Sequence, residues 1–359
     1  MFEAQAGETF KTPLPETPKN LTGGDVYLNL SWHRLSSPEW TNSDHVVAWD
    51  QILLEKEPTL ELGHSRRKGT PILLSPKRTA IENFDIEFPD SNKQGAIYYK
   101  GKEILSKFPH GCFWRPPTDN DGLKQGWMAE VTGAKRKWIS EGLDNLKTSS
   151  EIHQLQSTGK SASVLVTNEY LGVNANATHT SHIYVEGCNM YFEESFIITD
   201  EWDDLPRVGI QFEVPGHYSL VEWFGRGPLE SYPDRYRSQL VSKWHSQISE
   251  QYHPYVLPQE NGAHQDTKWF KLKSETEEEI IFHIPNADSF SASYVHDKDL
   301  TEALKISDIC DRTNSEVHID AAIRGLGTGA CGPDTLSEFR LSPGAYQILW
   351  ILQVSSSKP

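Results

Sequence analysis

The stretch THTSHIYVEGCNMYFEESFIIT, residues 178–199, decides the fold class of this 359-residue chain. Two runs within it alternate between apolar and polar side chains, and VEGCN between them has the composition of a hairpin turn. A repeat of two residues is typical of a strand with one buried face, and a turn between two such runs is typical of an antiparallel pair. We therefore predict a β-hairpin here.

Similar short runs recur between turn signals from about residue 75 to the end of the chain. They are AIENFDIEF, GAIYYKGKEIL, SASVLVTNEYL, RVGIQFEV, EEIIFHI, EVHIDAAIRG and AYQILWILQV. Helix candidates are few, and the best is DKDLTEALKIS (297–307), where Asp299 or Thr301 could cap a short helix. This pattern predicts an all-β fold with one large β-sandwich over residues 75–357.

The first 74 residues have a different character. Residues 1–24 are rich in Pro, Thr, Gly and Lys, which predicts a flexible tail. DVYLNLSWHRL and HVVAWDQILL predict two strands within residues 25–58, and residues 59–74 are expected to be a linker. Two strands alone bury too little surface to be stable, so they should pack on the following domain or pair with strands of another chain.

Composition excludes several classes of function. With 50 acidic against 34 basic side chains the formal charge is −16, which would repel nucleic acid and anionic lipid. No apolar run approaches the roughly 18 residues of a membrane span, and the N-terminus lacks a secretory signal, so we expect a cytoplasmic protein. The four cysteines form no CxxC pair, which predicts reduced thiols and no zinc site.

The segment FWRPPTDND, residues 113–121, combines an aromatic pair with an arginine, two aspartates and an asparagine. A carbohydrate site needs this mixture, because aromatic faces pack on sugar C–H groups while carboxylates and amides bond hydroxyls. The alternative is structural: Pro116 and Pro117 force an extended turn whose backbone is satisfied by Asp119, Asn120 and Asp121. The DND triplet lacks the spacing and the distal Glu of an EF-hand, so no such metal site is predicted.

A second candidate region, residues 223–264, fits neither an ordinary helix nor an ordinary strand. Hydrolysis of a glycosidic bond usually takes two carboxyl groups about 5–10 Å apart, and Glu230 and Glu260 are candidates whose separation a sequence cannot supply. Asp234 and Arg235 could instead form a local ion pair, and Glu260 could bond to backbone in a buried loop. Glu260 with His264 could also serve as base and acid for opening a sugar ring.

RGLGTGACGPDT, residues 324–335, is a Gly-rich loop expected between a strand ending near Ile323 and another beginning near Phe339. The order GxxxxGK[ST] is missing and no helix follows, so a phosphate cradle is not predicted. Close backbone packing or the approach of a ligand explains the glycines better. Cys331 has no cationic neighbour in sequence that would activate its thiol.

Taken in order, FWRPPTDND, WFGRGPLESYPDR, YVLPQENGAH, HIDAAIRGLGTGACGPDT and FRLSPGAYQILW resemble the C-terminal domain of the β-galactosidases of glycoside hydrolase family 2, also called the β-galactosidase small chain. VYLNLSWHRL and AWDQILL are similar to the last strands of the immunoglobulin-like domain that precedes it. The resemblance implies a large sandwich similar to galactose mutarotases, preceded by remnant strands of an immunoglobulin-like sandwich.

The same resemblance implies that the catalytic glutamates belong to a TIM barrel that this chain lacks, since no β/α alternation is present. The expected partners are a large, barrel-bearing β-galactosidase chain and β-galactosides, and Mg and Na are expected only in the barrel. Cys331 stands where some family members carry a Trp platform for the sugar. No catalytic residue and no metal ligand is therefore assigned, and the expected substrate-binding or supporting residues are Trp114, Arg115, Asp119, Asn120, Asp121, Arg226, Glu230, Asp234, Arg235, Glu260, Asn261, His264 and Cys331.

Three hypotheses for function follow. The first is a small subunit or C-terminal fragment of a β-galactosidase that is inactive alone and completes the site of a barrel chain. The second is a galactoside-binding module without catalysis, built on exposed aromatics such as Trp114, Trp223 and Trp244. The third is an aldose-1-epimerase-like enzyme that uses Glu260 and His264.

Overall fold

The computed structural model describes residues 7–13, 16, 24–34, 39–41, 44–56, 70–73, 78–90, 93–122, 133–156, 162–310, 312–327 and 334–354. The chain divides into two compact units, Met1–Pro58 and Thr59–Pro359, and each is described by itself. Cys112, Cys188 and Cys310 are free thiols as predicted, while Cys331 lies outside the described residues. In the described part of the chain, no helix is long and apolar enough to cross a membrane.

The first unit contains one antiparallel pair, β1 (Val26–His33) and β2 (Val46–Glu55). The two predicted strands are confirmed, with Asn29 opposite Gln51 at the centre of the pair. Their assignment to an immunoglobulin-like sandwich stays a prediction.

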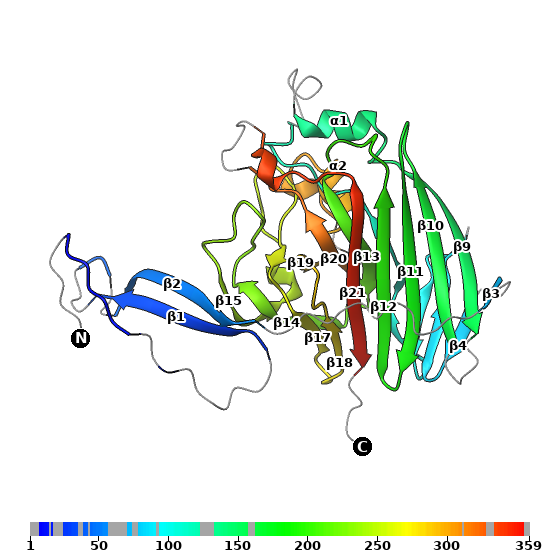
Figure 1. Cartoon of the computed structure of the whole chain (residues 1–359), viewed down its shortest axis with the longest axis horizontal. Helices are drawn as coiled ribbons and strands as arrows, with labels where there is room; N and C mark the ends of the chain where they lie inside the picture. Colours follow the sequence, from blue (N-terminus) through cyan, green and yellow to red (C-terminus); the bar gives the residue numbers. More distant parts are fainter. Residues whose placement is uncertain are drawn as a thin grey trace. The chain divides into compact units, whose positions relative to one another are not determined.

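The second unit is built on a ten-stranded antiparallel sheet. Its strands β21, β12, β11, β10 and β9 stand side by side in Figure 1. In spatial order the strands are β15 (Leu240–Gln247), β14 (Tyr218–Gly227), β17 (Trp269–Ser274), β18 (Glu279–His283), β21 (Gly344–Val354), β12 (Asn189–Ile198), β11 (Asn176–Glu186), β10 (Ala162–Leu171), β9 (Lys147–Gln156) and β3 (Thr70–Leu73).

Two smaller antiparallel sheets complete the sandwich. The five-stranded sheet has the order β16 (His264–Gln265), β19 (Ser289–Ser293), β20 (Ser315–Ile323), β13 (Arg207–Val214) and β8 (Lys107–Cys112). The four-stranded sheet has the order β4 (Arg78–Ile81), β5 (Phe84–Glu87), β6 (Ala96–Tyr99) and β7 (Lys102–Leu105).

One continuous apolar core joins these sheets. Phe212 of β13 stacks on Trp350 of β21 at 5.5 Å between ring centroids, and Phe192 of β12 stacks on the same indole at 3.7 Å. All three rings are completely buried. These rings bury a large apolar surface between the ten-stranded and the five-stranded sheet. Two sheets that share one core between their inner faces form a β-sandwich. The all-β sandwich predicted from the sequence is confirmed.

The hairpin predicted within residues 178–199 is formed by β11 and β12. The two strands are joined at Gly187 and Cys188, and Glu186 lies opposite Asn189. Buried and half-buried residues alternate along almost the whole of both strands. Gly187 has φ +66, a conformation that glycine adopts without strain, so VEGCN makes the tight turn as predicted.

The helices differ from expectation. A short helix does form in DKDLTEALKIS, as α2 (Asp297–Glu302), but its N-cap is His296 and no side chain caps it, so the predicted caps are wrong. The Thr301 hydroxyl instead donates to the Asp297 carbonyl, 2.7 Å away. A second helix, α1 (Ala134–Ser140), was not predicted, and it is anchored by the completely buried Trp138. Within the described residues the structure also has the 3₁₀ turns η2 (Ile248–Glu250), η3 (Ile306–Asp308) and η4 (Ser337–Phe339).

Three strand predictions need correction. The expected linker 59–74 contains β3, and the strand expected near Phe339 begins at Gly344 because η4 precedes it. Much of the segment 223–264 does form strands, in the second half of β14 and in β15. Its Gly, Arg and Trp residues conceal the alternation in sequence, although β14 alternates between buried and half-buried positions along most of its length.

Candidate functional site

Two of the sequence motifs meet through a buried ion network at one end of the sandwich. Arg115 and Asp121 are completely buried and form a two-pronged ion pair, with Nη1 to Oδ2 at 2.7 Å and Nη2 to Oδ1 at 3.0 Å. Asp121 also accepts from the backbone N–H and the hydroxyl of Thr118, at 2.8 and 2.9 Å. Of the three residues in the structural alternative, Asp121 bonds the backbone of the turn, whereas the Asn120 amide donates to the Leu326 carbonyl at 3.0 Å. The alternative is therefore confirmed only for Asp121, which a guanidinium also pairs.

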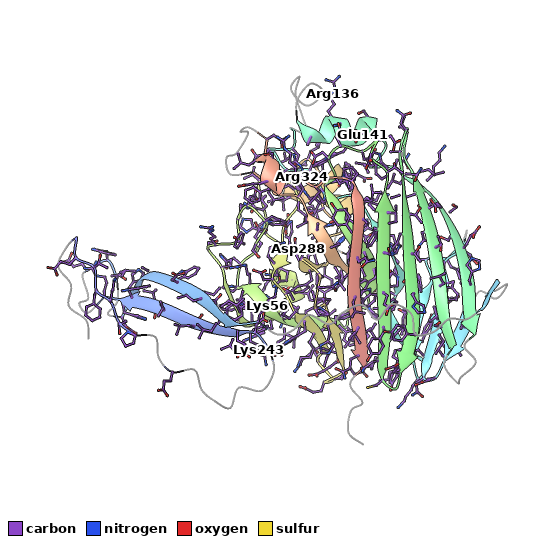
Figure 2. All side chains as sticks on the ribbon, viewed as in Figure 1. Lys56, Arg136, Glu141, Lys243, Asp288 and Arg324 are labelled. Carbon is purple, nitrogen blue, oxygen red and sulfur yellow. The ribbon has the colours of Figure 1, made fainter. Side chains whose placement is uncertain are left out.

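Arg324 extends this network from the start of the Gly-rich segment. It lies below α1 in Figure 2, with its guanidinium 5.5 Å from the ring centroid of Trp138. Its Nη1 donates to Asp121 at 3.2 Å, Nη2 to Asp334 at 2.7 Å and Nε to Asp204 at 3.0 Å. Because Asp334 lies beyond the glycines, this guanidinium links both ends of the segment.

Asp234 closes the base of the same segment. Its Oδ1 accepts from the backbone N–H of Leu326 at 3.1 Å, and Oδ2 accepts from the N–H of Gly327 at 2.6 Å and the hydroxyl of Thr335 at 3.1 Å. Gly327 has φ +88, and a Cβ there would lie 2.4 Å from the Asn120 amide nitrogen, so only glycine fits. The glycines at this base serve close backbone packing, as expected.

A second buried cluster surrounds Arg207, the first residue of β13, which is completely buried. Its Nη2 lies 3.0 Å from Glu260, its Nη1 2.8 Å from Asp297 and its Nε 3.1 Å from Asp320. The Tyr232 hydroxyl donates to the same Glu260 oxygen at 3.1 Å. One guanidinium thus faces three carboxyl groups.

Burial shifts all three carboxyl groups toward their protonated forms. Burial raises the pKa of Glu260 to about 8 and that of Asp320 to about 6, against the opposing pull of Arg207. Burial also raises the pKa of Asp297. We expect Glu260 to be mainly a neutral carboxylic acid at pH 7.

Cys112, Asp297 and His318 place potential metal-binding atoms within 4.8 Å of one another. The Arg207 guanidinium already lies among them, with Nη1 2.8 Å from Asp297 and 3.1 Å from the His318 Nδ1. Burial raises the pKa of the Cys112 thiol to about 12, so it keeps its proton. The geometry makes Arg207 the cation of this cluster and does not suit a metal ion.

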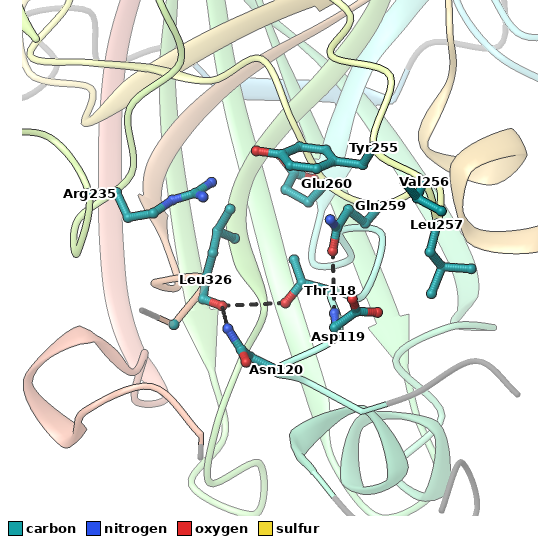
Figure 3. A pocket seen from close by; sticks show the side chains of 11 residues that line it. Thr118, Asp119, Asn120, Arg235, Tyr255, Val256, Leu257, Gln259, Glu260 and Leu326 are labelled. Carbon is teal, nitrogen blue, oxygen red and sulfur yellow. Dashed lines mark hydrogen bonds between the residues drawn. The ribbon is translucent and has the colours of Figure 1, made fainter. Parts of the chain in front are cut away.

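A cavity of about 320 Å³ opens beside the Arg207 cluster. Figure 3 shows the Tyr255 ring beside Glu260, with Arg235 on one side and Gln259 and Asp119 on the other. The backbone N–H of Asp119 donates to the Gln259 amide oxygen at 3.3 Å, which joins two walls of the cavity. Its other lining residues are Thr118, Asn120, Val256, Leu257, Leu326 and Gly327.

A second cavity of about 340 Å³ shares Arg235 and Tyr255 with the first. Glu230 lines it, and its carboxylate accepts from Arg235, from the Tyr255 hydroxyl and from the N–H of Gly262. Arg235 therefore pairs with Glu230, and the expected Asp234–Arg235 pair is wrong. His264 also lines this cavity.

The epimerase-like arrangement is not formed by the described residues, because Glu260 lines the first cavity and His264 the second. The His264 ring is buried between the Arg226 carbonyl at 3.0 Å and the Gln251 amide oxygen, and burial lowers its pKa to about 4. Glu260 is bonded by Arg207 and Tyr232 side chains, so the backbone-bonding alternative for it is also wrong.

The tryptophans expected to hold a sugar belong to the protein interior. Trp223 is buried in the core and donates to the Arg226 carbonyl. Trp114 is half-buried and donates to the Thr301 hydroxyl, and Trp244 is half-buried and donates to two backbone carbonyls. The description of these rings as exposed sugar platforms is wrong.

The remaining predicted residues have structural contacts. Arg226 pairs with Asp266 at 2.6 Å, and Asn261 holds the backbone of His253 at 3.0 Å. Cys331 lies outside the described residues. Sequence reasoning missed Arg207, Asp320 and the aromatic wall Tyr255; the one available signal was a charged residue at the start of the apolar run RVGIQFEV.

Comparison with known protein families identifies the family of this chain. A sequence model of the family described as "Beta galactosidase small chain" matches residues 81–352. The chain belongs to this family. Among curated β-galactosidases, the Kluyveromyces lactis protein is 31% identical over 83% of this chain and 29% of its own length, and that of Actinobacillus pleuropneumoniae is 26% identical over 93% and 32%. The small chain thus spans about a third of the length of these relatives.

Among solved structures, a galactose mutarotase-like protein of Lactobacillus casei matches with a TM-score of 0.34 and 11% identity, over 80% of this chain and 100% of its own. An aldose epimerase homologue of C. elegans matches with a TM-score of 0.37 and 11% identity, over 82% and 97%. The three sheets of the second unit confirm the large β-sandwich that the sequence predicts.

Proposed function

We propose that this small chain is a component of a β-galactosidase, inactive alone, whose sandwich docks on a barrel-bearing chain and completes its galactoside site. The family match over residues 81–352 carries the proposal, together with relatives that are three times as long and named β-galactosidase. Mg and Na, in this proposal, bind to the barrel-bearing partner.

The carboxyl groups of the chain support a non-catalytic role. Glu230 accepts from a guanidinium, a phenol and a backbone N–H, so its lone pairs are directed into the protein. Glu260 accepts from Arg207 and Tyr232 through its Oε1. A glycosidase needs a nucleophile and an acid that face the substrate, and these two residues do not form such a pair.

The loop end of the sandwich offers apolar side chains for docking. Val256, on the rim of the first cavity, is 90% exposed, and Leu229, on the rim of the second, is 67% exposed. Exposed apolar residues beside polar cavities are typical of an interface with another protein. We assign this end to the barrel-bearing chain.

The hairpin of β1 and β2 is a second docking element of the same proposal. Trp32 on one face is 52% exposed and Trp49 on the other is 37% exposed. A two-stranded sheet with apolar side chains on both faces is marginal in water until other strands cover it. The barrel-bearing chain, in this proposal, supplies that cover.

The test is hydrolysis of a chromogenic β-galactoside by the purified chain, by a β-galactosidase fragment that ends before this region, and by their mixture. Activity in the mixture alone is expected. Trp32→Ser with Trp49→Ser should weaken complementation, whereas Ile197→Ser, which replaces an exposed apolar residue on β12 of the sandwich, should not. Activity of the isolated chain, or an inactive mixture, would refute the proposal.

A further inference from the structure

A third cavity, of about 230 Å³, lies between β8, at the edge of the five-stranded sheet, and the strands β9 and β10. Its buried lining is apolar and comes from Phe108 and Pro109 of β8 and from Val166 of β10. The half-buried Ile152 of β9 extends this surface. An apolar surface of this kind suits the body of an aromatic or aliphatic ligand.

The charge of this cavity differs from that of the other two. Lys107 is the one charged side chain among its described lining residues, and no carboxylate lines it. Lys107 makes no salt bridge with a described residue; Glu213, opposite it in the pairing of β8 with β13, instead accepts from the Asn314 amide at 3.4 Å. Burial and the nearby Lys107 ammonium lower the pKa of His110 to about 3, so this imidazole is neutral at pH 7.

One ammonium without a carboxylate partner favours an anion in the cavity. The chain as a whole has a formal charge of −16, but salt screens the more distant acidic groups over about 10 Å. The local ammonium therefore decides the sign of the ligand. A cationic ligand would face Lys107, and a neutral ligand would leave its charge without a partner.

Tyr170 adds a hydrogen-bond donor to the cavity. Its hydroxyl oxygen accepts from the backbone N–H of Gly111 at 2.8 Å, and its own proton has no acceptor among the described residues. Burial raises the pKa of this hydroxyl, so it keeps the proton. A Cβ at Gly111 would lie 3.0 Å from the hydroxyl oxygen, so glycine lets the phenol approach the strand. The donor is fixed before any ligand binds.

A ladder of polar side chains connects the cavity to the core across neighbouring strands of the ten-stranded sheet (Figure 1). Trp350 donates to one oxygen of Glu194 at 3.0 Å, and the other oxygen lies 2.8 Å from Nε2 of His179. Nδ1 of His179 lies 3.4 Å from the amide nitrogen of Asn168, and the hydroxyl of Ser150 donates to the Asn168 oxygen. Buried polar groups need such partners. The ladder holds Asn168 in the cavity wall, with a second amide proton that no described residue accepts.

We propose that this cavity binds a small monocarboxylate with an aromatic or aliphatic body. The carboxylate pairs with the Lys107 ammonium and accepts hydrogen bonds from the donors of the wall, while the body of the ligand packs on Phe108 and Val166. A carboxylate accepts several hydrogen bonds at once, and those to charged donors are the strongest. Walls that are fixed in advance reduce the entropy lost on binding.

The experiment is a ligand-observed NMR titration of the full chain with benzoate. Two further probes separate the parts of the argument: benzamide has the same ring without the charge, and inorganic phosphate has charge without an apolar body. We expect benzoate to saturate with a dissociation constant on the order of 1 mM. Benzamide and phosphate should bind about tenfold more weakly or not at all.

Three variants locate the site. Lys107→Met keeps an apolar stem and should weaken benzoate about tenfold, to the level of benzamide. Thr148→Trp, at an exposed position of the rim, should block both ligands. Lys147→Met is the matched control: Thr148, Ser150 and Ile152 of β9 line the cavity, so the exposed Lys147 is on the opposite face and its removal should change nothing.

The result that would overturn the proposal is no saturation by benzoate up to tens of millimolar. Equal affinity for benzoate and benzamide, or equal losses in Lys107→Met and Lys147→Met, would also overturn it.

This inference goes beyond the proposed docking, because the cavity shares no lining residue with the two cavities described above and the assay uses the isolated chain. Benzoate binding without complementation would refute the proposed function alone. Complementation without benzoate binding would refute this site alone.

Discussion

Raising the pH from 7 to 9 should destabilise the folded chain through Glu260. Its carboxyl group faces Arg207 and the Tyr232 hydroxyl, with Asp297 and Asp320 across the guanidinium. Burial raises its pKa to about 8, whereas the unfolded chain keeps the ordinary value of 4.5. The folded state therefore holds a proton that the unfolded state has already lost.

The sign and size of the effect follow from this difference. Where the folded state binds more protons, the free energy of unfolding falls as the pH rises. A folded pKa of about 8 places a loss on the order of 1 kcal/mol between pH 7 and pH 9. Asp288, whose pKa burial raises to about 7, adds a smaller loss in the same direction.

Buried histidines do not obscure this window. Burial lowers the pKa of His110 and His318 to about 3 and that of His264 to about 4. Their contribution to stability rises with pH mainly below the ordinary histidine value of 6.5, and the small rise that remains above pH 7 is the same in the wild type and in a Glu260 variant.

The assay is urea unfolding at pH 7, 8 and 9, for the wild-type chain and for Glu260→Gln. The glutamine oxygen can still accept from Arg207 and Tyr232, but the side chain no longer titrates. We expect the wild-type free energy of unfolding to fall by on the order of 1 kcal/mol more than that of the variant. Equal declines would show that Glu260 is already ionised at pH 7 and would refute the reasoning.

Three further outcomes test the packing. Asp121→Ala leaves two buried guanidinium groups without their shared partner, and should cost about 3–5 kcal/mol of unfolding free energy in a urea titration. Gly216→Ala would place a Cβ 1.7 Å from the Thr313 carbonyl oxygen, and a loss of about 1–3 kcal/mol by thermal unfolding is expected. Asp234→Ala frees two backbone N–H groups of the Gly-rich segment; it should cost about 1–3 kcal/mol and reduce complementing activity in the chromogenic assay, and unchanged values of both would remove its assigned role.

Much of the fold could be predicted because strands with one buried face repeat every two residues. β11 and β12 follow that rule almost without exception, and their turn carries the expected glycine. AIENFDIEF instead divides into β4 and β5 around Glu82, which has φ +54. The turn is made by Glu82 and Asn83 and contains no glycine, so the sequence pattern does not show that this run contains two strands.

The site could be predicted only where its residues are neighbours in sequence. Arg115 and Asp121 are six positions apart, and one motif contains both. Arg207 meets Asp320 because β13 pairs with β20, with Gly209 opposite Asp320. A Cβ at Gly209 would lie 2.6 Å from the Asp320 Oδ1, so glycine allows this approach. Strand pairing over such separations cannot be read from a single sequence.

The two buried networks differ in charge. Arg115 and Arg324 meet Asp121, Asp204 and Asp334, and Asp334 also pairs with an exposed arginine, so that network is balanced. The other network has three carboxyl groups for one guanidinium. Burying such an excess is costly unless protons or hydrogen-bond donors offset it. The raised pKa of Glu260, about 8, means that this carboxyl group keeps a proton at neutral pH, which offsets part of the excess.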